Sequence, residues 1–259
     1  MGANAGIGRA VAAEFASHRY NVILAGRDLE ELQTLAADVK LRHSVSAQAE
    51  RVDVLDFDAL EPALAACLAA AGDSLEGVVF CIGYIGDPEA ARKDLNEARR
   101  ILDTNFTGSA LALEILARHF ERNHKGFICA VSSVAGDRGR QSNYLYGSAK
   151  GGLTTYLQGL RNRLYHSGVH VLTVKPGYVD TRMAFGKIGA RQETPRAPAR
   201  SARTRSGAPF LVAAPASVAA RIYDAVKTRK NVVYVPSFWR LVMFIVRSIP
   251  EGVFKRLKT

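Results

Sequence analysis

The chain of 259 residues has few cysteines, one tryptophan and no long hydrophobic run. Its three cysteines, Cys67, Cys81 and Cys129, are odd in number and lack CxxC or Cys/His spacing. This excludes a disulfide framework and a zinc site, and it favours a reducing, cytoplasmic location. The apolar run at residues 241–246 is far shorter than the roughly 18 residues of a membrane-spanning helix. We therefore predict no metal site, no signal peptide and no transmembrane helix.

Acidic residues are scarce only toward the C-terminus. The formal charge is +11, from 35 basic and 24 acidic side chains. Residues 182–259 contain 16 basic and 3 acidic residues and so carry +13, which leaves −2 for residues 1–181. One basic end on a nearly neutral body favours an anionic substrate or a membrane surface as the partner. The arginines of this end are not interleaved with the aromatic residues of a base-stacking platform, so we predict no nucleic-acid partner.

Short β-branched apolar runs alternate with helical patterns along the chain. The strand-like runs lie at residues 21–25, 49–54, 77–82, 127–132, 169–174 and 231–235, and helical spacing is clearest at residues 29–41 and 101–120. Repeated strand–helix alternation predicts a Rossmann-like, doubly wound parallel sheet in a three-layer αβα arrangement. The length fits one such domain over residues 1–259.

Two segments near the C-terminus depart from this alternation. Residues 182–215 are rich in proline, alanine and arginine and fit neither period, so we predict a substrate-binding or lid loop there. Residues 238–259 form an apolar tail bracketed by arginine and lysine, a pattern suited to lying in a lipid headgroup layer. A helix that is apolar on nearly every side is equally suited to packing on the body or across a dimer interface, so both interpretations stay open.

A glycine-rich loop opens the chain. Gly2, Gly6 and Gly8, with Asn4 and Ile7 between them, directly precede a helical pattern. Glycines allow a tight turn and let backbone N–H groups and the helix N-terminus approach a pyrophosphate. Such a loop belongs after the first strand, which is normally central in the sheet. We therefore expect the first strand to be missing from this chain, through a misplaced start codon or a damaged gene.

The residues that follow the predicted strand at 21–25 indicate which dinucleotide the protein binds. Gly26 and Arg27 follow Gly8 by about the spacing that places an adenosine ribose. A cation there, where an NAD site would carry a carboxylate, favours the 2′-phosphate of NADP(H). NAD(H) stays open, because Asp28 could bind a ribose and Arg27 could be a solvated residue at a helix start.

Several separated motifs together resemble one family. Gly2-x-x-x-Gly6-x-Gly8, Asn105, Ser133, Tyr146-x-x-x-Lys150 and Pro176-Gly177 match the classical short-chain dehydrogenases/reductases in order and spacing over nearly the whole chain. The resemblance implies that Tyr146 is the general acid/base and that Ser133 hydrogen-bonds the substrate oxygen. It also implies that Lys150 holds the nicotinamide ribose and favours the ionised phenol, and that Asn105 supports a proton-relay water. A fixed cation beside a phenol of pKa near 10 agrees with this chemistry.

The same resemblance assigns further residues to the cofactor, at the adenine side, beside the cofactor and along its nicotinamide end: Asp53, Val54, Gly83, Pro176, Gly177, Val179 and Thr181. A simple turn at a strand end is an equally good interpretation of Asp53. The chain departs from the family pattern twice. Met1-Gly2 stands in place of Thr-Gly, and Phe80-Cys81-Ile82-Gly83 stands in place of Asn-Asn-Ala-Gly.

Within the family, residues 132–144, 233–240 and 249–257 are similar to bacterial reductases of decaprenylphosphoryl-2-keto-ribose in cell-envelope synthesis. This predicts an NAD(P)H-dependent oxidoreductase that interconverts a ketone and a secondary alcohol, with a phosphate-bearing or polyprenyl-linked keto sugar as the favoured substrate. We expect a cytoplasmic homo-oligomer, a dimer or tetramer, with peripheral membrane contact left open. The alternatives are a reductase of soluble carbonyl or fatty acyl ketones, or a catalytically impaired cofactor-binding protein without its first strand.

Overall fold

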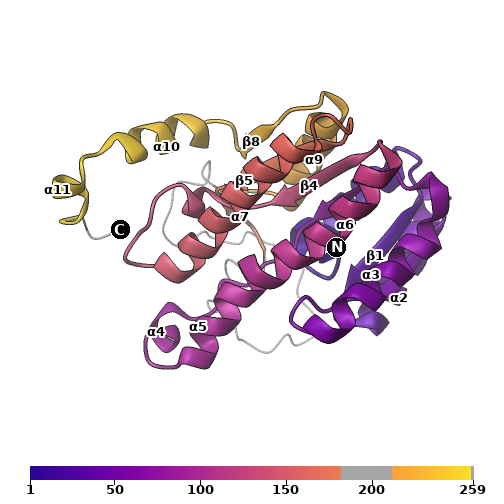
Figure 1. Ribbon diagram of the computed structural model, residues 1–259, viewed down its shortest axis with the longest axis horizontal. Coiled ribbons are helices and arrows are strands. Elements are labelled where there is room, and N and C mark those ends of the chain that lie inside the picture. Colours follow the sequence, from indigo (N-terminus) through magenta and orange to yellow (C-terminus); the bar gives the residue numbers. More distant parts are fainter. Residues whose placement is uncertain (182–211, 258–259) are drawn as a thin grey trace, which may run out of the picture.

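The computed structural model describes residues 1–181 and 212–257 (Figure 1). Within these ranges, strands alternate with helices as predicted. The strands are β1 (Val22–Gly26), β2 (Ala47–Arg51), β3 (Gly77–Phe80), β4 (Phe127–Val131), β5 (His170–Pro176), β6 (Tyr178–Val179), β7 (Val212–Ala213) and β8 (Val232–Val235). Most of the predicted loop at 182–215 lies outside the described residues.

Long helices connect the strands, with shorter turns between some of them. The α-helices are α1 (Gly6–Ser17), α2 (Leu29–His43), α3 (Phe57–Ala71), α4 (Pro88–Ala91), α5 (Leu95–Leu102), α6 (Gly108–Asn123), α7 (Tyr144–Leu164), α9 (Pro215–Lys227), α10 (Trp239–Ser248) and α11 (Glu251–Phe254). Short 3₁₀ turns form η1 (Gly72–Ser74) and η3 (Val134–Gly136), and a π-helical turn forms η2 (Asp103–Thr107). Among the residues described, no helix is long and apolar enough to cross a membrane.

All strand pairs are parallel. β3, β4, β5 and β8 form one sheet in that order, β1 pairs with β2, and β6 pairs with β7. The strand predicted at 49–54 begins two residues earlier and ends three residues earlier in the structure, where β2 is Ala47–Arg51. Val52 and Val54 are buried, yet they lie beyond the ladder in the loop that follows it. The apolar pattern at these positions reflects their burial in the core, not pairing in a strand.

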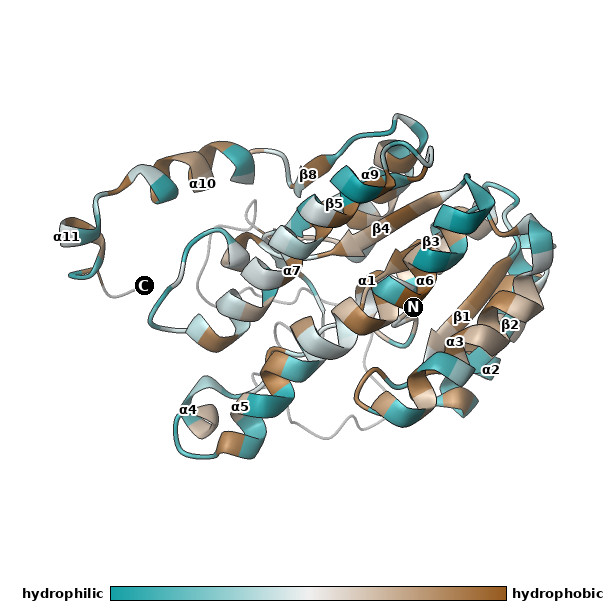
Figure 2. Ribbon diagram, in the orientation of Figure 1, coloured by the Kyte–Doolittle hydropathy of each residue, from teal (hydrophilic) through white to brown (hydrophobic). Residues whose placement is uncertain are grey.

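Helices cover both faces of the sheet, which confirms the three-layer arrangement. On one face, α3, α6 and α7 contribute side chains such as Leu64, Leu113 and Leu157 to a core with β3 and β4. On the other face, α1 and α9 pack together, and Phe15 and Ile222 lie in a second core. Figure 2 shows hydrophobic strands between helices that turn their polar residues outward. The fold is therefore the predicted doubly wound α/β type.

A slot separates β1 from β3. A cavity of about 620 Å³ lies between them and is lined by apolar residues that include Val22, Leu24, Leu64, Val79 and Phe127. No strand within residues 1–181 and 212–257 pairs with both of its edges. This is the position at which the first strand of a doubly wound sheet is expected.

Met1 occupies one end of this slot. Its amino group donates a hydrogen bond to the Val79 carbonyl at 3.1 Å, and its carbonyl accepts one from the Cys81 amide at 3.0 Å. On the other side, the Gly2 amide donates to the Ala25 carbonyl at 2.7 Å. These bonds follow the pattern of a parallel ladder and hold the glycine loop against both sheets. Burial lowers the pKa of the Met1 amino group.

The predicted helix over residues 101–120 is interrupted. Between α5 and α6, η2 (Asp103–Thr107) is a turn of π-helix, which widens the backbone and leaves carbonyls without their usual partners. The side-chain amide of Asn105 donates to the Ile101 carbonyl at 2.7 Å, and the Ser109 hydroxyl donates to the Thr104 carbonyl at 2.7 Å. The side chain of Asn105 is thereby fixed inside the fold.

Candidate active site

The glycine loop forms a close turn at the start of α1. A Cβ on Gly8 would lie 2.2 Å from the Gly2 carbonyl oxygen, and a Cβ on Gly6 would lie 2.9 Å from the Thr181 methyl group. Gly2 has a φ of +74°, which favours glycine. α1 begins after Ala5 with no side-chain cap, so the N–H groups of its first turn are directed to the space over the loop. Such a cradle fits a pyrophosphate.

A pocket of about 110 Å³ lies beside this loop, at the ends of β1 and β2. The predicted cofactor residues Gly2, Asn4, Arg27, Asp53, Val54 and Gly83 all line it. The Asn4 amide donates to the Asp28 carbonyl at 3.2 Å and to the Glu31 carboxylate at 2.9 Å, which fixes the loop against α2. The structure therefore brings the adenosine-side residues together.

Charge in this pocket favours an anion. Arg27 is exposed at its rim, whereas Asp28 caps α2 by accepting a hydrogen bond from the Glu31 amide at 3.0 Å. The Asp28 carboxylate, which could have bound a ribose, thus has a partner in the backbone of α2. Arg100, which sequence reasoning missed, also lines the pocket and stacks over the Tyr84 ring at 4.5 Å. The Asp53 carboxylate accepts from the Leu55 amide at 3.0 Å, as in a strand-end turn.

Lys150 lies across the carboxyl ends of two strands. Its ammonium donates to the carbonyls of Ile82, after β3, at 3.2 Å and of Val131, in β4, at 3.1 Å. These bonds use two of its three N–H donors. The side chain is 2% exposed, and burial lowers its pKa to about 8. Lys150 is therefore held where ligands bind in open α/β sheets.

Tyr146 lies in the first turn of α7 (Tyr144–Leu164), four residues before Lys150 on the same face of the helix. The Lys150 ammonium lies 6.0 Å from the centre of the Tyr146 ring. Ser133, at the end of β4, forms a side-chain hydrogen bond with Tyr146 that lowers the phenol pKa, yet burial dominates and raises that pKa to about 12. In this arrangement the Lys150 ammonium is directed to the two carbonyls, and its effect on the ionised phenol stays a prediction.

Asn105 is fully buried behind these residues. Its amide donates to the Tyr84 carbonyl at 2.6 Å, and its side-chain oxygen accepts from the Tyr84 amide at 3.0 Å. This reciprocal pair fixes the chain just after Gly83. Asn105 thus holds the segment that follows β3 in place beside the pocket.

The segment after β5 completes the predicted nicotinamide end. Pro176 ends β5, and Val179 is buried in β6. Trp239 lies against Gly177 so closely that a Cβ there would be 2.0 Å from the indole nitrogen. Thr181 and Gly6 meet side by side, so this segment lies beside the glycine loop. Ile7 is half-buried in the same helix start.

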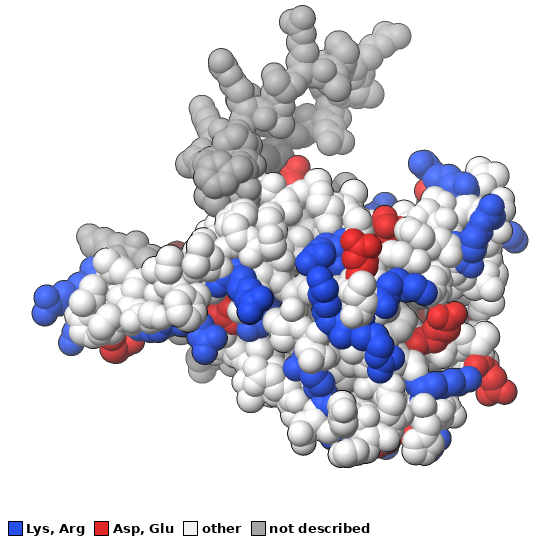
Figure 3. All heavy atoms as spheres, turned by 90° about the horizontal axis from the view of Figure 1, so that it is seen from above, with Lys and Arg blue, Asp and Glu red and all other residues white. Residues whose placement is uncertain are grey.

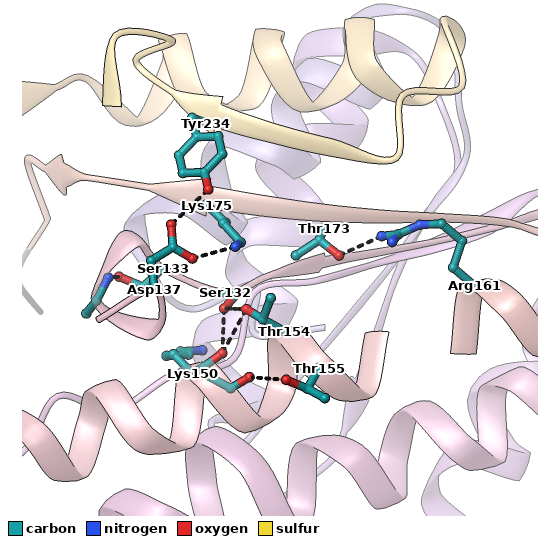
Figure 4. Close-up of polar contacts among 12 residues, drawn as sticks. Ser132, Ser133, Asp137, Lys150, Thr154, Thr155, Arg161, Thr173, Lys175 and Tyr234 are labelled. Carbon is teal, nitrogen blue, oxygen red and sulfur yellow. Dashed lines mark hydrogen bonds and ion pairs between the residues drawn. The ribbon is translucent and has the colours of Figure 1, made fainter. Parts of the chain in front are cut away.

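Two polar clusters around the site, centred on Ser132 and on Asp137, could not be predicted from the sequence (Figure 4). The Ser132 hydroxyl donates to the Lys150 carbonyl at 2.9 Å and contacts the Thr154 hydroxyl at 2.8 Å. Asp137 accepts from Lys175 at 2.5 Å and from the Tyr234 hydroxyl at 2.8 Å. These residues are far apart in the sequence, and no sequence spacing predicts their contacts. Within the described ranges, no group of His, Cys, Asp or Glu could hold a metal ion.

The family comparison agrees with this geometry. The model of the short chain dehydrogenase family matches residues 1–190, more than half of the chain. The chain belongs to the short-chain dehydrogenase family. An uncharacterized oxidoreductase of Streptomyces coelicolor is 31% identical over 262 aligned residues, covering 99% of this chain and 94% of that protein. The serine 3-dehydrogenase of Agrobacterium fabrum is 31% identical over 74% of this chain and 75% of its own length.

Solved structures of oxidoreductases share the fold. The actinorhodin polyketide ketoreductase with NADPH superposes with a TM-score of 0.76 at 20% identity, over 92% of this chain and 94% of that one. The short-chain dehydrogenase from Sphingobium yanoikuyae in complex with NADPH gives 0.72 at 21% identity, over 97% and 95%. This protein is thus an NAD(P)-dependent oxidoreductase of the short-chain dehydrogenase type that acts on CH–OH groups.

Proposed function

We propose that the protein is an NADP(H)-dependent reductase that converts a ketone to a secondary alcohol, with Ser133, Tyr146, Lys150 and Asn105 as its catalytic set. The observation that carries this proposal is the meeting of three of these groups at the carboxyl ends of β3 and β4. The nicotinamide supplies the hydride when it is bound. The protein's residues then have to orient the ketone and provide one proton.

Each residue has a distinct role in this reaction. The Ser133 hydroxyl donates a hydrogen bond to the ketone oxygen and orients it toward the Tyr146 hydroxyl. Tyr146 donates its proton to that oxygen as negative charge develops there. Burial raises the pKa of Tyr146 to about 12, so the phenol is protonated at neutral pH, and a nearby positive charge is needed to favour loss of its proton. Lys150 supplies a fixed positive charge beside the phenolate left behind, and Asn105 orders the adjoining chain.

The proposed cofactor residues divide among three parts of the site. Gly2, Asn4, Gly6 and Ile7 would hold the pyrophosphate at the start of α1. Arg27, Asp53, Val54 and Gly83 would surround the adenosine, with Arg27 on a 2′-phosphate. Pro176, Gly177, Val179 and Thr181 would line the nicotinamide end together with Asn105, Tyr146 and Lys150.

NADPH preference has a direct test at Arg27. A charge-assisted hydrogen bond to phosphate contributes about 1.5–3 kcal/mol, so Arg27→Asp should lower the NADPH-to-NADH ratio of kcat/KM by about tenfold or more. Arg42→Gln, on the far end of α2 and paired with Asp38, is the matched control and should leave the ratio unchanged. An unaltered ratio in Arg27→Asp would remove this residue from the cofactor site.

For the substrate, we favour a phosphate-bearing or polyprenyl-linked keto sugar. The +13 charge of residues 182–259 supports an anionic substrate, and the resemblance to decaprenylphosphoryl-2-keto-ribose reductases supports a keto sugar. Ketones of acyl chains are the second candidate. A polyketide ketoreductase and a 3-ketoacyl-ACP reductase from Sinorhizobium meliloti are among the structural neighbours.

A matched set of substrates separates these candidates. NADPH oxidation would be followed with a phosphorylated keto sugar, the same sugar without phosphate, and a 3-ketoacyl thioester. We expect the highest kcat/KM for the phosphorylated sugar and a clear loss on removal of its phosphate. Preference for the thioester would assign the second function, and no oxidation with any ketone would contradict the reductase proposal.

Assembly and location belong to the same proposal. We expect a homo-oligomer, a dimer or tetramer, which light scattering after gel filtration measures directly. We also propose that residues 238–259 provide a peripheral contact with a membrane, where a lipid-linked substrate would be found. The protein would otherwise work from the cytoplasm.

A further inference from the structure

The loop that carries Ser133 also contacts the C-terminal helices. We define the Ser133 loop as residues 133–138, and the C-terminal segment as residues 238–257. On one side the loop touches α7 closely: a Cβ on Gly136 would lie 2.7 Å from the Gly151 nitrogen, one residue beyond Lys150. On the other side Val134 packs with Trp239 and Met243 of α10. The loop therefore lies between the proposed catalytic helix and the C-terminal segment.

Asp137 anchors the Ser133 loop to the sheet (Figure 4). Its carboxylate accepts from Lys175 of β5 at 2.5 Å and from the Tyr234 hydroxyl of β8 at 2.8 Å. The side chains of Lys175 and Asp137 are only 7% and 3% exposed. A buried ion pair of this kind fixes the base of the loop, because separating it would leave a charge without a partner.

Arg138 fastens the other end of the loop to the C-terminal segment. Its guanidinium donates to the carbonyls of Arg247 and Ile249, each at 3.1 Å, at the C-terminus of α10. It also pairs with Glu251 at 2.7 Å and lies 4.2 Å from the centre of the Phe254 ring. A cation at a helix C-terminus satisfies carbonyls that have no partner within the helix. One side chain thus joins α10 and α11 to the Ser133 loop.

The outer face of the C-terminal segment is apolar and exposed. Leu241, Phe244 and Ile245 follow one another at helical spacing and are 64%, 71% and 56% exposed, and Val253 and Leu257 are exposed beyond them. Arg240, Arg247, Lys255 and Arg256 are exposed around this face, against one acidic residue, Glu251. Figure 3 shows the segment projecting from the body, with an uncharged surface bordered by lysine and arginine. We call this surface the α10 face.

The chemistry of the α10 face fits an anionic lipid surface. Large apolar side chains enter the boundary between headgroups and acyl chains, and basic residues at their border bind anionic headgroups. A second copy of the chain would bring the same arginines and lysines together, which costs free energy through like-charge repulsion. Charge complementarity therefore favours lipid over self-association.

We propose that the α10 face docks on anionic lipid and that Arg138 transmits this docking to the Ser133 loop as a positioning residue. This deepens the proposed function, on which it rests for its catalytic consequence. Docking immobilises α10 and α11, and the guanidinium bonds of Arg138 then hold the loop in one position beside Tyr146. Activity would consequently be higher on a lipid surface than in solution, even toward a water-soluble ketone.

Docking is tested by flotation of the full chain with vesicles of phosphatidylcholine and phosphatidylglycerol, and with vesicles of phosphatidylcholine alone. We expect binding only to the anionic vesicles. The double variant Phe244→Ser/Ile245→Ser should bind the anionic vesicles at least about tenfold more weakly than the wild type, because two apolar side chains no longer enter the lipid. Leu41→Ser, at an 83% exposed position of α2, is the matched control and should bind like the wild type. Unchanged flotation of the double variant would overturn the proposal. A change of the double variant from oligomer to monomer would also overturn it, because the α10 face would then contact a second copy of the chain.

Transmission is tested with Arg138→Gln, and with Arg122→Gln on the exposed part of α6 as the control. We expect Arg138→Gln to float like the wild type, while its ratio of activity with and without vesicles falls to one. Hydrogen exchange gives a readout that does not need turnover: anionic vesicles should slow exchange at residues 133–138 in the wild type and in Arg122→Gln, but not in Arg138→Gln. Slowing that persists in Arg138→Gln would overturn the role of Arg138. Absence of ketone reduction in all variants, with these exchange results intact, would contradict the proposed function alone.

Discussion

Lys150 combines a proposed catalytic role with an energetic cost. An ammonium that is 2% exposed is disfavoured by burial, and two carbonyls compensate it only in part, as its lowered pKa shows. The spacing of Tyr146 and Lys150 was sufficient to predict that they share a helix face. Their pKa values could not be predicted from spacing, because these depend on burial and on carbonyls from β4 and from the residue after β3.

The buried ammonium makes stability depend on pH. Burial lowers the Lys150 pKa from 10.5 to about 8, so the folded protein loses this proton before the unfolded chain does. Below pH 8 the cost of the buried charge is fully present, and it is relieved as pH rises from 8 toward 10.5. Tyr146 and Cys81, whose pKa values are raised, oppose this gain at the upper end.

Comparison with Lys150→Met isolates the contribution of this residue. The free energy of unfolding of the wild type, measured in urea relative to that of Lys150→Met, should rise across this window by an amount on the order of 3 kcal/mol. Groups that do not interact with Lys150 cancel in this difference, whereas Cys81 is electrostatically coupled to Lys150 and adds to it. A difference that stays constant with pH would contradict the burial of a charged Lys150.

At the scale of elements, the central strands and the long helices were predictable, whereas the special turns were not. β1, β3, β4, β5 and β8 follow apolar runs that the sequence displays directly. The π-helical turn η2 depends on side-chain bonds from Asn105 and Ser109, which no periodicity reveals. The short strands β6 and β7 exist only through pairing with each other across a long segment.

The glycine loop offers a test of the pyrophosphate cradle. In Gly8→Ala, the new Cβ would lie 2.2 Å from the Gly2 carbonyl, so the loop must shift and NADPH affinity should fall by at least about tenfold. The control is Gly159→Ala in α7, where a Cβ meets nothing within 4 Å. That variant should keep its affinity and gain roughly 0.5–1 kcal/mol of stability from helix propensity. Titration by fluorescence and urea unfolding measure both, and equal affinities would contradict the cradle.

At the scale of the whole molecule, the sheet is divided by the slot between β1 and β3. Among the described residues, only Met1 and Gly2 connect the two edges in the manner of a strand. The motif order predicted a gap at this position, while the apolar lining of the slot required the three-dimensional structure.

The slot predicts the effect of an added strand. A five-residue segment of valine and isoleucine fused before Met1 should pair with both edges, fill the cavity and replace a buried amino group by an amide. Hydrogen bonds and apolar burial together should raise Tm by about 5 °C or more, measured by calorimetry. A fusion of the same length made of lysine and proline cannot pair or enter an apolar slot, and it should give no increase. Equal Tm values for the two fusions would contradict this account of the slot.

The central claim concerns the proton that Tyr146 provides, and its most direct test is NADPH oxidation by the wild type and Tyr146→Phe with the same ketone. The variant lacks only the hydroxyl, so it should bind NADPH with unchanged affinity and lose kcat by about a hundredfold or more. Tyr165→Phe, at a position 74% exposed, should retain full activity. A Tyr146→Phe enzyme that binds NADPH and turns over at the wild-type rate would contradict the assignment of the active site.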